Sequence, residues 1–466
     1  MHTPTIRTEI SEYLQVHNMK TSDFATATGL NPGTVSSILT SNRALSVHQL
    51  DCVTTGMGKP EDYFYTRYVQ DYIVDTSLDW RRVKSFLNRC AVLNRLDCIA
   101  QVVVLLMDNF TYYAGLVFDL AEDFFEQKQY EAAALLYRNV AFSEKNQHSE
   151  RLATCHYRLF QMRIGDDQIQ NMKAAIEFEP YAERLEEIEQ LDALKDLANL
   201  YRAIGQWDKV FELAQNMGRK AKIQYRLKHQ SGRKNNDAFN KLSKPLFTYI
   251  AYSDHLSASA CDERGDYEQG ARHIQAYGDL SWVKEEDPEA LHWIQTYRAW
   301  AEINACVNKL MSGDMSVLHQ YVDYIENKQD NIFVELINVL EVAILHNVDI
   351  DSIIERFEHR VMDSWDQESD DVYTRNVLPD EMARFWYKTA KYRFGRGSYL
   401  YGFKSLILCL ELSVTINNRS LILSAMGLFE YYRDYSTPET QKQFNKIIKE
   451  VWVKHDEKDG FFYSFN

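Results

Sequence analysis

The chain has 466 residues, of which 45% are hydrophobic and 26% charged, and its formal net charge is -15 at pH 7. This acidic balance argues against a protein that coats nucleic acid, but it does not exclude one small module that reads a specific DNA site. The length predicts several folding units or one long repeat array, and the scarcity of Pro (8) and Gly (18) predicts an all-α chain of helices joined by short turns.

Cysteine usage and hydropathy give the expected compartment. The seven cysteines are odd in number, scattered, and form no C-x-x-C pair, which favours buried, reduced thiols over a metal or disulfide framework. No apolar run approaches the ~20 residues of a membrane span, and the opening "MHTPTIRTEISEYL" is not typical of a signal peptide. We therefore expect a cytoplasmic protein with no membrane partner, no metal and no cofactor.

Residues 1–75 are predicted to form a module of short helices. The first begins at Thr3-Pro4, and the second begins near Thr21 and ends at Gly29 in a left-handed cap. The third lies within "GLNPGTVSSILTSN", where Asn31 caps a helix that starts at Pro32. A fourth starts after Ser46 and a fifth with Lys59-Pro60-Glu61.

The third predicted helix is too short and polar to be an ordinary core element. Its apolar residues Val35 and Ile38 are predicted to face inward, which leaves the hydroxyl residues outward. Two helices joined by a tight Gly turn, the second polar outside, are typical of a helix-turn-helix whose second helix enters a major groove. The predicted phosphate contacts are Lys20, Thr21, Asn42 and Arg43, and the base-edge or sugar contacts are Asn31, Thr34, Ser36 and Ser37. Gly33 is a further predicted DNA-binding residue.

The segment "MKTSDFATATGLNPGTVSSILTSNRALSVHQLDCVTTGMG" resembles the lambda-repressor-like (XRE-type) helix-turn-helix, with matches at Ala25, Gly29, Leu30, Val35, Ser36 and Ile38. Thr21 stands where that family usually has Gln, Leu39 replaces a position that is often polar, and the recognition helix contains no Lys or Arg. We therefore expect a monomer to bind DNA weakly and a homodimer to bind a two-fold operator. The alternative is a module kept only for dimerisation or protein binding.

Residues 76–466 are predicted to form a superhelical tetratricopeptide-repeat solenoid. This 34-residue repeat needs a small residue and an aromatic on its first helix, a Gly-containing turn, and a small residue on its second helix. Four segments fit, within residues 120–137, 194–214, 258–270 and 386–402. Two polar stretches interrupt the array, Lys228 to Lys241, read as a loop or a hinge, and Ser364 to Glu381, read as a break before a C-terminal pair of helix hairpins.

Such arrays curve, and their first helices line a concave groove that suits a peptide. Asn side chains offer a donor and an acceptor to a peptide backbone, and Lys or Arg suits a carboxylate. Each candidate has the alternative of lying on a solvated helix face. The predicted peptide-binding residues are Lys195, Asn199, Arg202, Tyr252, His255, Ser259, Asn304, Asn308 and Lys388.

A helix-turn-helix followed by tetratricopeptide repeats resembles the RRNPP family of quorum-sensing receptors of Firmicutes and their phages, which share this plan with the arbitrium receptors. The resemblance implies a homodimeric transcriptional regulator that binds double-stranded DNA and is controlled by an oligopeptide of about five to ten residues in the groove. The alternative is a non-enzymatic adaptor that sequesters a partner protein, as Rap-type members do. No metal spacing, phosphate loop or nucleophile elbow is present in the sequence, so we expect no enzymatic activity.

Overall fold

The computed structural model describes residues 4–40, 45–74, 79–147, 149–165, 167–230, 239, 241–328, 331–363 and 372–459. All elements in these residues are helical and none is a strand, which confirms the predicted all-α class. The chain divides into two compact units, an N-terminal unit (Met1–Met162) and a C-terminal unit (Arg163–Asn466). The sequence placed its domain boundary after residue 75, whereas the helices between 80 and 162 belong to the same compact unit as the first helices.

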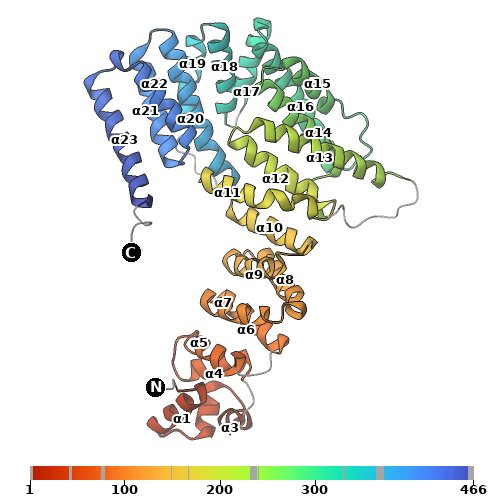
Figure 1. Cartoon of the computed structure of the whole chain (residues 1–466), viewed down its shortest axis with the longest axis vertical. Helices are drawn as coiled ribbons and strands as arrows, with labels where there is room; N and C mark the ends of the chain where they lie inside the picture. Colours follow the sequence, from red (N-terminus) through yellow and green to blue (C-terminus); the bar gives the residue numbers. More distant parts are fainter. Residues whose placement is uncertain are drawn as a thin grey trace. The chain divides into compact units, whose positions relative to one another are not determined.

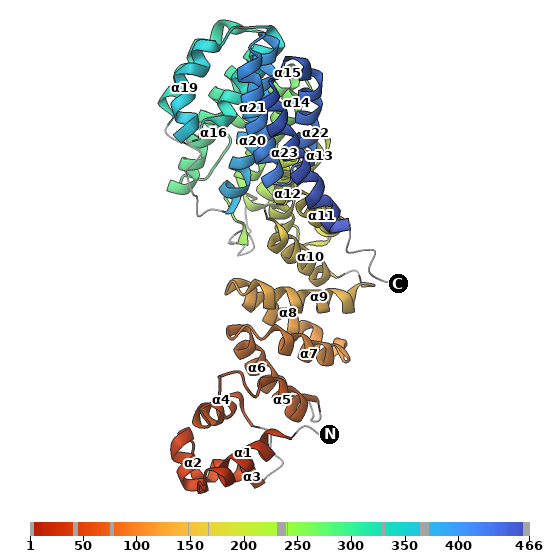
Figure 2. The same ribbon diagram turned by 90° about the vertical axis from the view of Figure 1, so that its left-hand side faces the viewer.

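The N-terminal unit begins with four short helices that group together in Figure 2. Their bounds are α1 (Ile6–Val16), α2 (Thr21–Thr28), α3 (Pro32–Thr40) and α4 (Val47–Gly56). The unit continues with α5 (Tyr65–Val69), a π-helical turn (Gln70–Val74), α6 (Trp80–Val92), α7 (Leu96–Met107), α8 (Phe110–Glu126), α9 (Tyr130–Glu144) and α10 (Glu150–Arg163).

Local sequence signals account for these first helices. Gly29 ends α2 with φ +67°, a left-handed conformation that glycine adopts without strain. Ser46 caps α4, accepting a hydrogen bond from the backbone N–H of Gln49, whose side chain bonds back to Ser46. The predicted start of the fifth helix at Lys59 was wrong, because turns occupy residues 61–64 and α5 begins at Tyr65.

Aromatic packing fixes α1–α4 to the rest of the N-terminal unit. Phe86 on α6 packs against Tyr65 and Tyr68 on α5, with ring centroids 5.3 and 4.9 Å apart. The hydroxyl of Tyr65 donates to Asp51 Oδ1 on α4 at 2.7 Å. Because Arg89 on α6 also pairs with Asp51, at 3.2 Å, α4, α5 and α6 share one half-buried junction.

The C-terminal unit is a succession of paired helices (Figure 1). Neighbours in sequence pack against each other along most of the unit, as from α12 to α16 and from α20 to α22. The helices are α11 (Gln168–Phe178), α12 (Glu189–Ala203), α13 (Trp207–Lys228), α14 (Leu246–Glu263), α15 (Tyr267–Gly278), α16 (Pro288–Met311), α17 (Leu318–Asn327), α18 (Phe333–His346), α19 (Asp351–Asp363), α20 (Val372–Gly395), α21 (Tyr399–Thr415), α22 (Arg419–Tyr431) and α23 (Pro438–Asp459).

The structure describes the two predicted polar breaks to different extents. Residues 231–238 and 240, within the first break, lie outside the described residues, and so do residues 364–371 of the second. The remainder of the second break is helical, because α20 starts at Val372 and continues through Pro379. Pro379, within this predicted break, lies inside a helix of 24 residues.

A polar cluster joins the beginning of the C-terminal unit to its later helices. Asp380 on α20 accepts hydrogen bonds from Gln168 Nε2 of α11 at 3.0 Å, from Asn418 Nδ2 at 2.8 Å and from Arg384 Nε at 2.6 Å. Asn417 Nδ2 adds a bond to Asp167 Oδ2 at 3.2 Å. We call Gln168, Asp380, Arg384 and Asn418 the Asp380 clasp. The clasp links the first helix of the C-terminal unit to its later helices, because the bond from Gln168 to Asp380 spans 212 positions.

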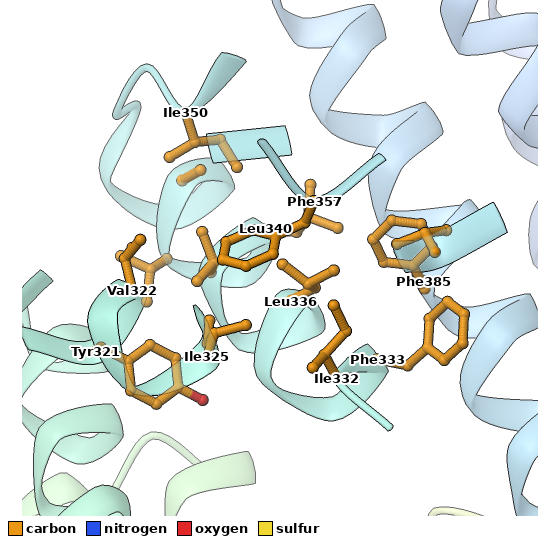
Figure 3. Close-up of a cluster of buried hydrophobic side chains, with 14 of the residues drawn as sticks. Tyr321, Val322, Ile325, Ile332, Phe333, Leu336, Leu340, Ile350, Phe357 and Phe385 are labelled. Carbon is orange, nitrogen blue, oxygen red and sulfur yellow. The ribbon is translucent and has the colours of Figure 1, made fainter. Parts of the chain in front are cut away.

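A dense apolar core holds α17, α18, α19 and α20 together (Figure 3). Leu336 and Leu340 of α18 lie in the middle of this cluster, with Ile350, Phe357 and Phe385 around them. These side chains are 4% exposed or less, so their burial is a main source of stability for this part of the unit.

Candidate functional site

Helix α3 presents a hydroxyl-bearing outer face within the N-terminal unit. Val35 and Ile38 are buried, at 1% and 6% exposure, against the other short helices. Ser36, Ser37 and Thr40 are exposed, and Thr40 Oγ1 donates to the Ser36 carbonyl at 2.7 Å. This is the inside–outside arrangement predicted from the sequence for this helix.

The predicted DNA-contacting residues occupy the start of α2 and the length of α3. Lys20, which precedes α2, is exposed, and Thr21 is half-buried. Asn31 Oδ1 accepts from the Gly33 N–H at 2.9 Å, so this side-chain oxygen caps α3. Thr34 is half-buried, and Gly33 is exposed beside the cap. Asn42 and Arg43 lie outside the described residues.

The C-terminal unit encloses a cavity of about 1170 Å³. Its walls come from α11, the α12–α13 turn, α14, α16, α18, α20 and α22, so residues from 168 to 424 meet around one space. Five of the predicted peptide-binding residues line it: Arg202, His255, Ser259, Asn304 and Lys388. We call this space the large cavity.

The other four predicted peptide-binding residues lie outside the cavity lining. Lys195 Nζ donates to Asp192 Oδ1 at 2.6 Å and to Ser243 Oγ at 2.7 Å, which fixes α12 to the segment before α14. Tyr252 donates its hydroxyl hydrogen to Asn199 Oδ1. Asn308 is 6% exposed, and its Nδ2 donates to Asp262 Oδ1 at 2.7 Å and to the Tyr267 carbonyl at 2.9 Å. In this structure these side chains form hydrogen bonds that link neighbouring elements.

An aromatic and amide cluster reaches the large cavity through His255 and Asn304. The His255 ring stacks on Tyr252 at 5.7 Å, and the Tyr277 and Trp300 rings lie 5.4 Å from it. Asn304 Nδ2 donates to the Tyr277 hydroxyl at 2.7 Å. Desolvation, with a further contribution from Arg202, lowers the pKa of His255 to about 3, so this ring is neutral at pH 7.

The charge of the cavity lining is opposite to that of the whole chain. Six Lys or Arg residues line it against three Asp or Glu residues, whereas the chain carries a formal charge of -15. Lys388 forms an ion pair with Glu341, and burial raises the pKa of Asp262 to about 6. The excess of cations favours a ligand that carries negative charge.

Sequence reasoning missed several lining residues, notably Lys173 of α11 and Arg419 of α22. Both reach the large cavity only because the Asp380 clasp brings the first and later helices of the unit together. No repeat pattern in the sequence carries that long-range contact, so no local signal identifies these two residues.

The described residues hold no cluster of three or more His, Cys, Asp or Glu side chains that is arranged for a metal ion. Among the described helices, none combines the length and the apolar character that crossing a bilayer requires. Comparison of the chain with protein-family models, with curated proteins and with solved structures found no match.

Proposed function

We propose that the chain is a DNA-binding transcriptional regulator controlled by a short peptide that binds in the large cavity. In this proposal α2 and α3 form an XRE-type helix-turn-helix, and the C-terminal unit is a tetratricopeptide-like solenoid. The observation that carries the proposal is the large cavity, because Arg202, His255, Ser259, Asn304 and Lys388 line a single space of about 1170 Å³. That volume exceeds the ~300–1,000 Å³ of ordinary small-molecule sites, and a peptide of several residues suits it.

The lining offers the groups that a peptide needs. Asn304 supplies an amide whose nitrogen also donates to the Tyr277 hydroxyl. Arg202 and Lys388, the second of which is paired with Glu341, are the cations that suit a carboxylate. The exposed hydroxyls of α3 support the DNA-binding part of the proposal, since they offer donors and acceptors to base edges and phosphates. A homodimer would place two such helices on a two-fold operator.

Control by peptide would follow from a population shift. The C-terminal unit would exist in two conformations, and the peptide would favour the one that it binds more tightly. Only the difference between its affinities for the two conformations moves the equilibrium. The bound and free states would then present the two DNA-binding modules differently to operator half-sites.

The test combines calorimetry with a DNA-shift assay on the full chain. Short peptides encoded immediately downstream of the gene are titrated into the protein, and DNA from the promoter region is then shifted with and without saturating peptide. We expect one peptide to bind and to change the DNA affinity, and Asn304→Ala to weaken peptide binding. Absence of binding by every such peptide contradicts the peptide part of the proposal.

The DNA part is tested by adding negative charge to α3. Ser36→Glu should abolish the shift through repulsion of phosphates, whereas Thr415→Glu, an equal charge at an exposed position of α21, should leave it unchanged. An unshifted promoter fragment for the unsubstituted protein, at low salt, contradicts DNA binding.

The absence of Lys and Arg from α3 favours one second candidate, a protein-interaction adaptor. Such a protein would ignore DNA and bind a partner protein tightly through its helices. The same DNA-shift assay separates the two candidates, because an adaptor gives no salt-sensitive shift with any promoter fragment.

A further inference from the structure

Charged residues of opposite sign line the large cavity at two separate places. Asp262 and Glu263, the last two residues of α14, contribute carboxylates. Lys173 of α11 and Arg419 of α22 contribute cations, and the Asp380 clasp ties α11 to the start of α22. Figure 1 shows α14 and α22 on opposite sides of the C-terminal unit. The cavity is therefore lined by an acidic place at α14 and a basic place at α11 and α22.

The two carboxylates of α14 lack a cation of their own. Within the described part of the chain, neither Asp262 nor Glu263 forms an ion pair. Desolvation raises the pKa of Asp262 to about 6, and it also raises the pKa of Glu263 even though Lys388 and Arg384 favour its charged form. A raised pKa means that too little positive charge surrounds these groups, so an ammonium group from a ligand would stabilise their charged forms.

Lys173 is the matching group at the basic place. Its side chain is exposed, and it forms no ion pair with any described residue. Three other cations of the lining are already paired with carboxylates: Arg264 with Asp208, Arg384 with Asp380 and Lys388 with Glu341. A negative group that enters the cavity thus finds its available cation at Lys173, next to Arg419.

The helix ends add to this separation of charge. Because α14 ends at Glu263, the negative end of its dipole lies beside the two carboxylates. Because α22 begins at Arg419, the positive end of its dipole lies at the basic place. The cap of α22 is the neutral side chain of Asn418, and Asp380, which is bonded to that cap, is paired with Arg384.

We infer that the large cavity binds a linear peptide whose two ends are both free, with its N-terminal ammonium at Asp262 and Glu263 and its C-terminal carboxylate at Lys173 and Arg419. The inference rests on the proposed peptide-binding function and adds the orientation of the peptide and the chemistry of its ends. Every unmodified peptide carries one such charge at each end. The ammonium supplies the positive charge missing at α14, and the carboxylate accepts charge-assisted hydrogen bonds from the cations.

Affinity selection on the full chain, with hexapeptides of random sequence as the probe, tests the inference. The mixture is synthesised in four forms: with free ends, with an acetylated N-terminus, with an amidated C-terminus, and with both ends blocked. Retained sequences are identified by mass spectrometry, and their dissociation constants are measured by calorimetry in all four forms. We expect each blocking group to weaken binding about tenfold, because it removes one charged contact.

Two variants assign the two ends. Glu263→Gln should reduce the effect of acetylation to about threefold and leave the effect of amidation at about tenfold, whereas Lys173→Gln should do the reverse. A merely structural role of either residue would not produce this exchange. Glu289→Gln and Lys442→Gln make the same chemical changes at exposed positions outside the lining and should keep both effects. Thermal melting of each variant verifies that it is folded.

The outcomes separate this inference from the function on which it rests. If retained hexapeptides bind equally well with blocked ends, or if Glu263→Gln and Lys173→Gln behave as the controls do, the inference is overturned while peptide binding stands. If end-blocking has the expected effects but no peptide encoded downstream of the gene binds, the inference stands and the proposed signal is wrong. If no hexapeptide is retained in any form, the inference is overturned, and peptide binding loses its support with it.

Discussion

The four short helices α1–α4 and the large cavity are built in opposite ways. The residues that shape α3 lie within a few dozen positions of one another, and each cap and turn can be recognised separately in the sequence. The large cavity requires residues from 168 to 424, and the Asp380 clasp completes it through bonds that span more than 200 positions. Damage to α1–α4 should therefore stay local, whereas damage to the clasp should affect the C-terminal unit as a whole.

The largest expected effect is that of Asp380→Ala, because the substitution leaves Gln168, Arg384 and Asn418 without their shared acceptor. Asp380 is 8% exposed, and we expect a loss of about 3–5 kcal/mol in the unfolding free energy of the C-terminal unit. Hydrogen exchange should rise in both α11 and α20. Asp434→Ala, at an exposed position, is the control and should cost less than ~0.5 kcal/mol. If the Asp380→Ala protein is as stable as this control, the clasp does not stabilise the C-terminal unit.

Ile38→Ala should come next and should act locally. Removing this buried side chain from α3 leaves a small void and should cost about 2–4 kcal/mol. We expect faster hydrogen exchange in α1–α4 and unchanged exchange in α12–α22. Thr40→Ala, on the exposed face of the same helix, should be nearly neutral. Faster hydrogen exchange throughout the C-terminal unit would contradict the expectation that damage to α1–α4 stays local.

The third effect depends on pH and concerns Asp262 in the large cavity. Its folded-state pKa of about 6 lies above the ~3.9 of an unfolded chain, so the folded state binds a proton more tightly. The stability that this proton provides is complete below about pH 4 and is lost as the pH rises through 6. Asp262→Asn should therefore raise the unfolding free energy by about 2 kcal/mol at pH 7.5 and leave it almost unchanged at pH 4. Denaturant titrations at the two pH values measure the difference, and an equal effect at both would refute the assignment.

The smallest effect has the opposite sign. Thr389→Val removes a buried hydroxyl that has no partner among the described residues, and the volume hardly changes. We expect a gain of about 1 kcal/mol in the absence of any ligand. A destabilised Thr389→Val protein would mean that the hydroxyl is already satisfied.

The same contrast explains which features the sequence could predict. Helix α3, its Gly29 turn and its buried Val35 and Ile38 follow from capping residues and apolar spacing, which act over a few positions. Five of the nine predicted peptide-binding residues line the large cavity because the groove-facing side of α12, α14, α16 or α20 can be read from helical periodicity. Asn308 was chosen by the same reading, but its amide is taken by Asp262 and Tyr267. The places of Lys173 and Arg419 in the cavity lining depend on packing between distant helices, which no local pattern records.

The span of the clasp has a consequence for synthesis of the chain. The bond between Asp167 and Asn417, next to the clasp, joins residues 250 positions apart, so the C-terminal unit cannot close on itself until residue 417 has been synthesised. At ~5–20 residues per second, roughly 10–50 seconds separate the appearance of α11 from that of its partners. During that interval the α1–α4 bundle can already be folded while the pocket of the C-terminal unit does not yet exist. A nascent chain would thus acquire helices α1–α4 well before its large cavity could hold any ligand.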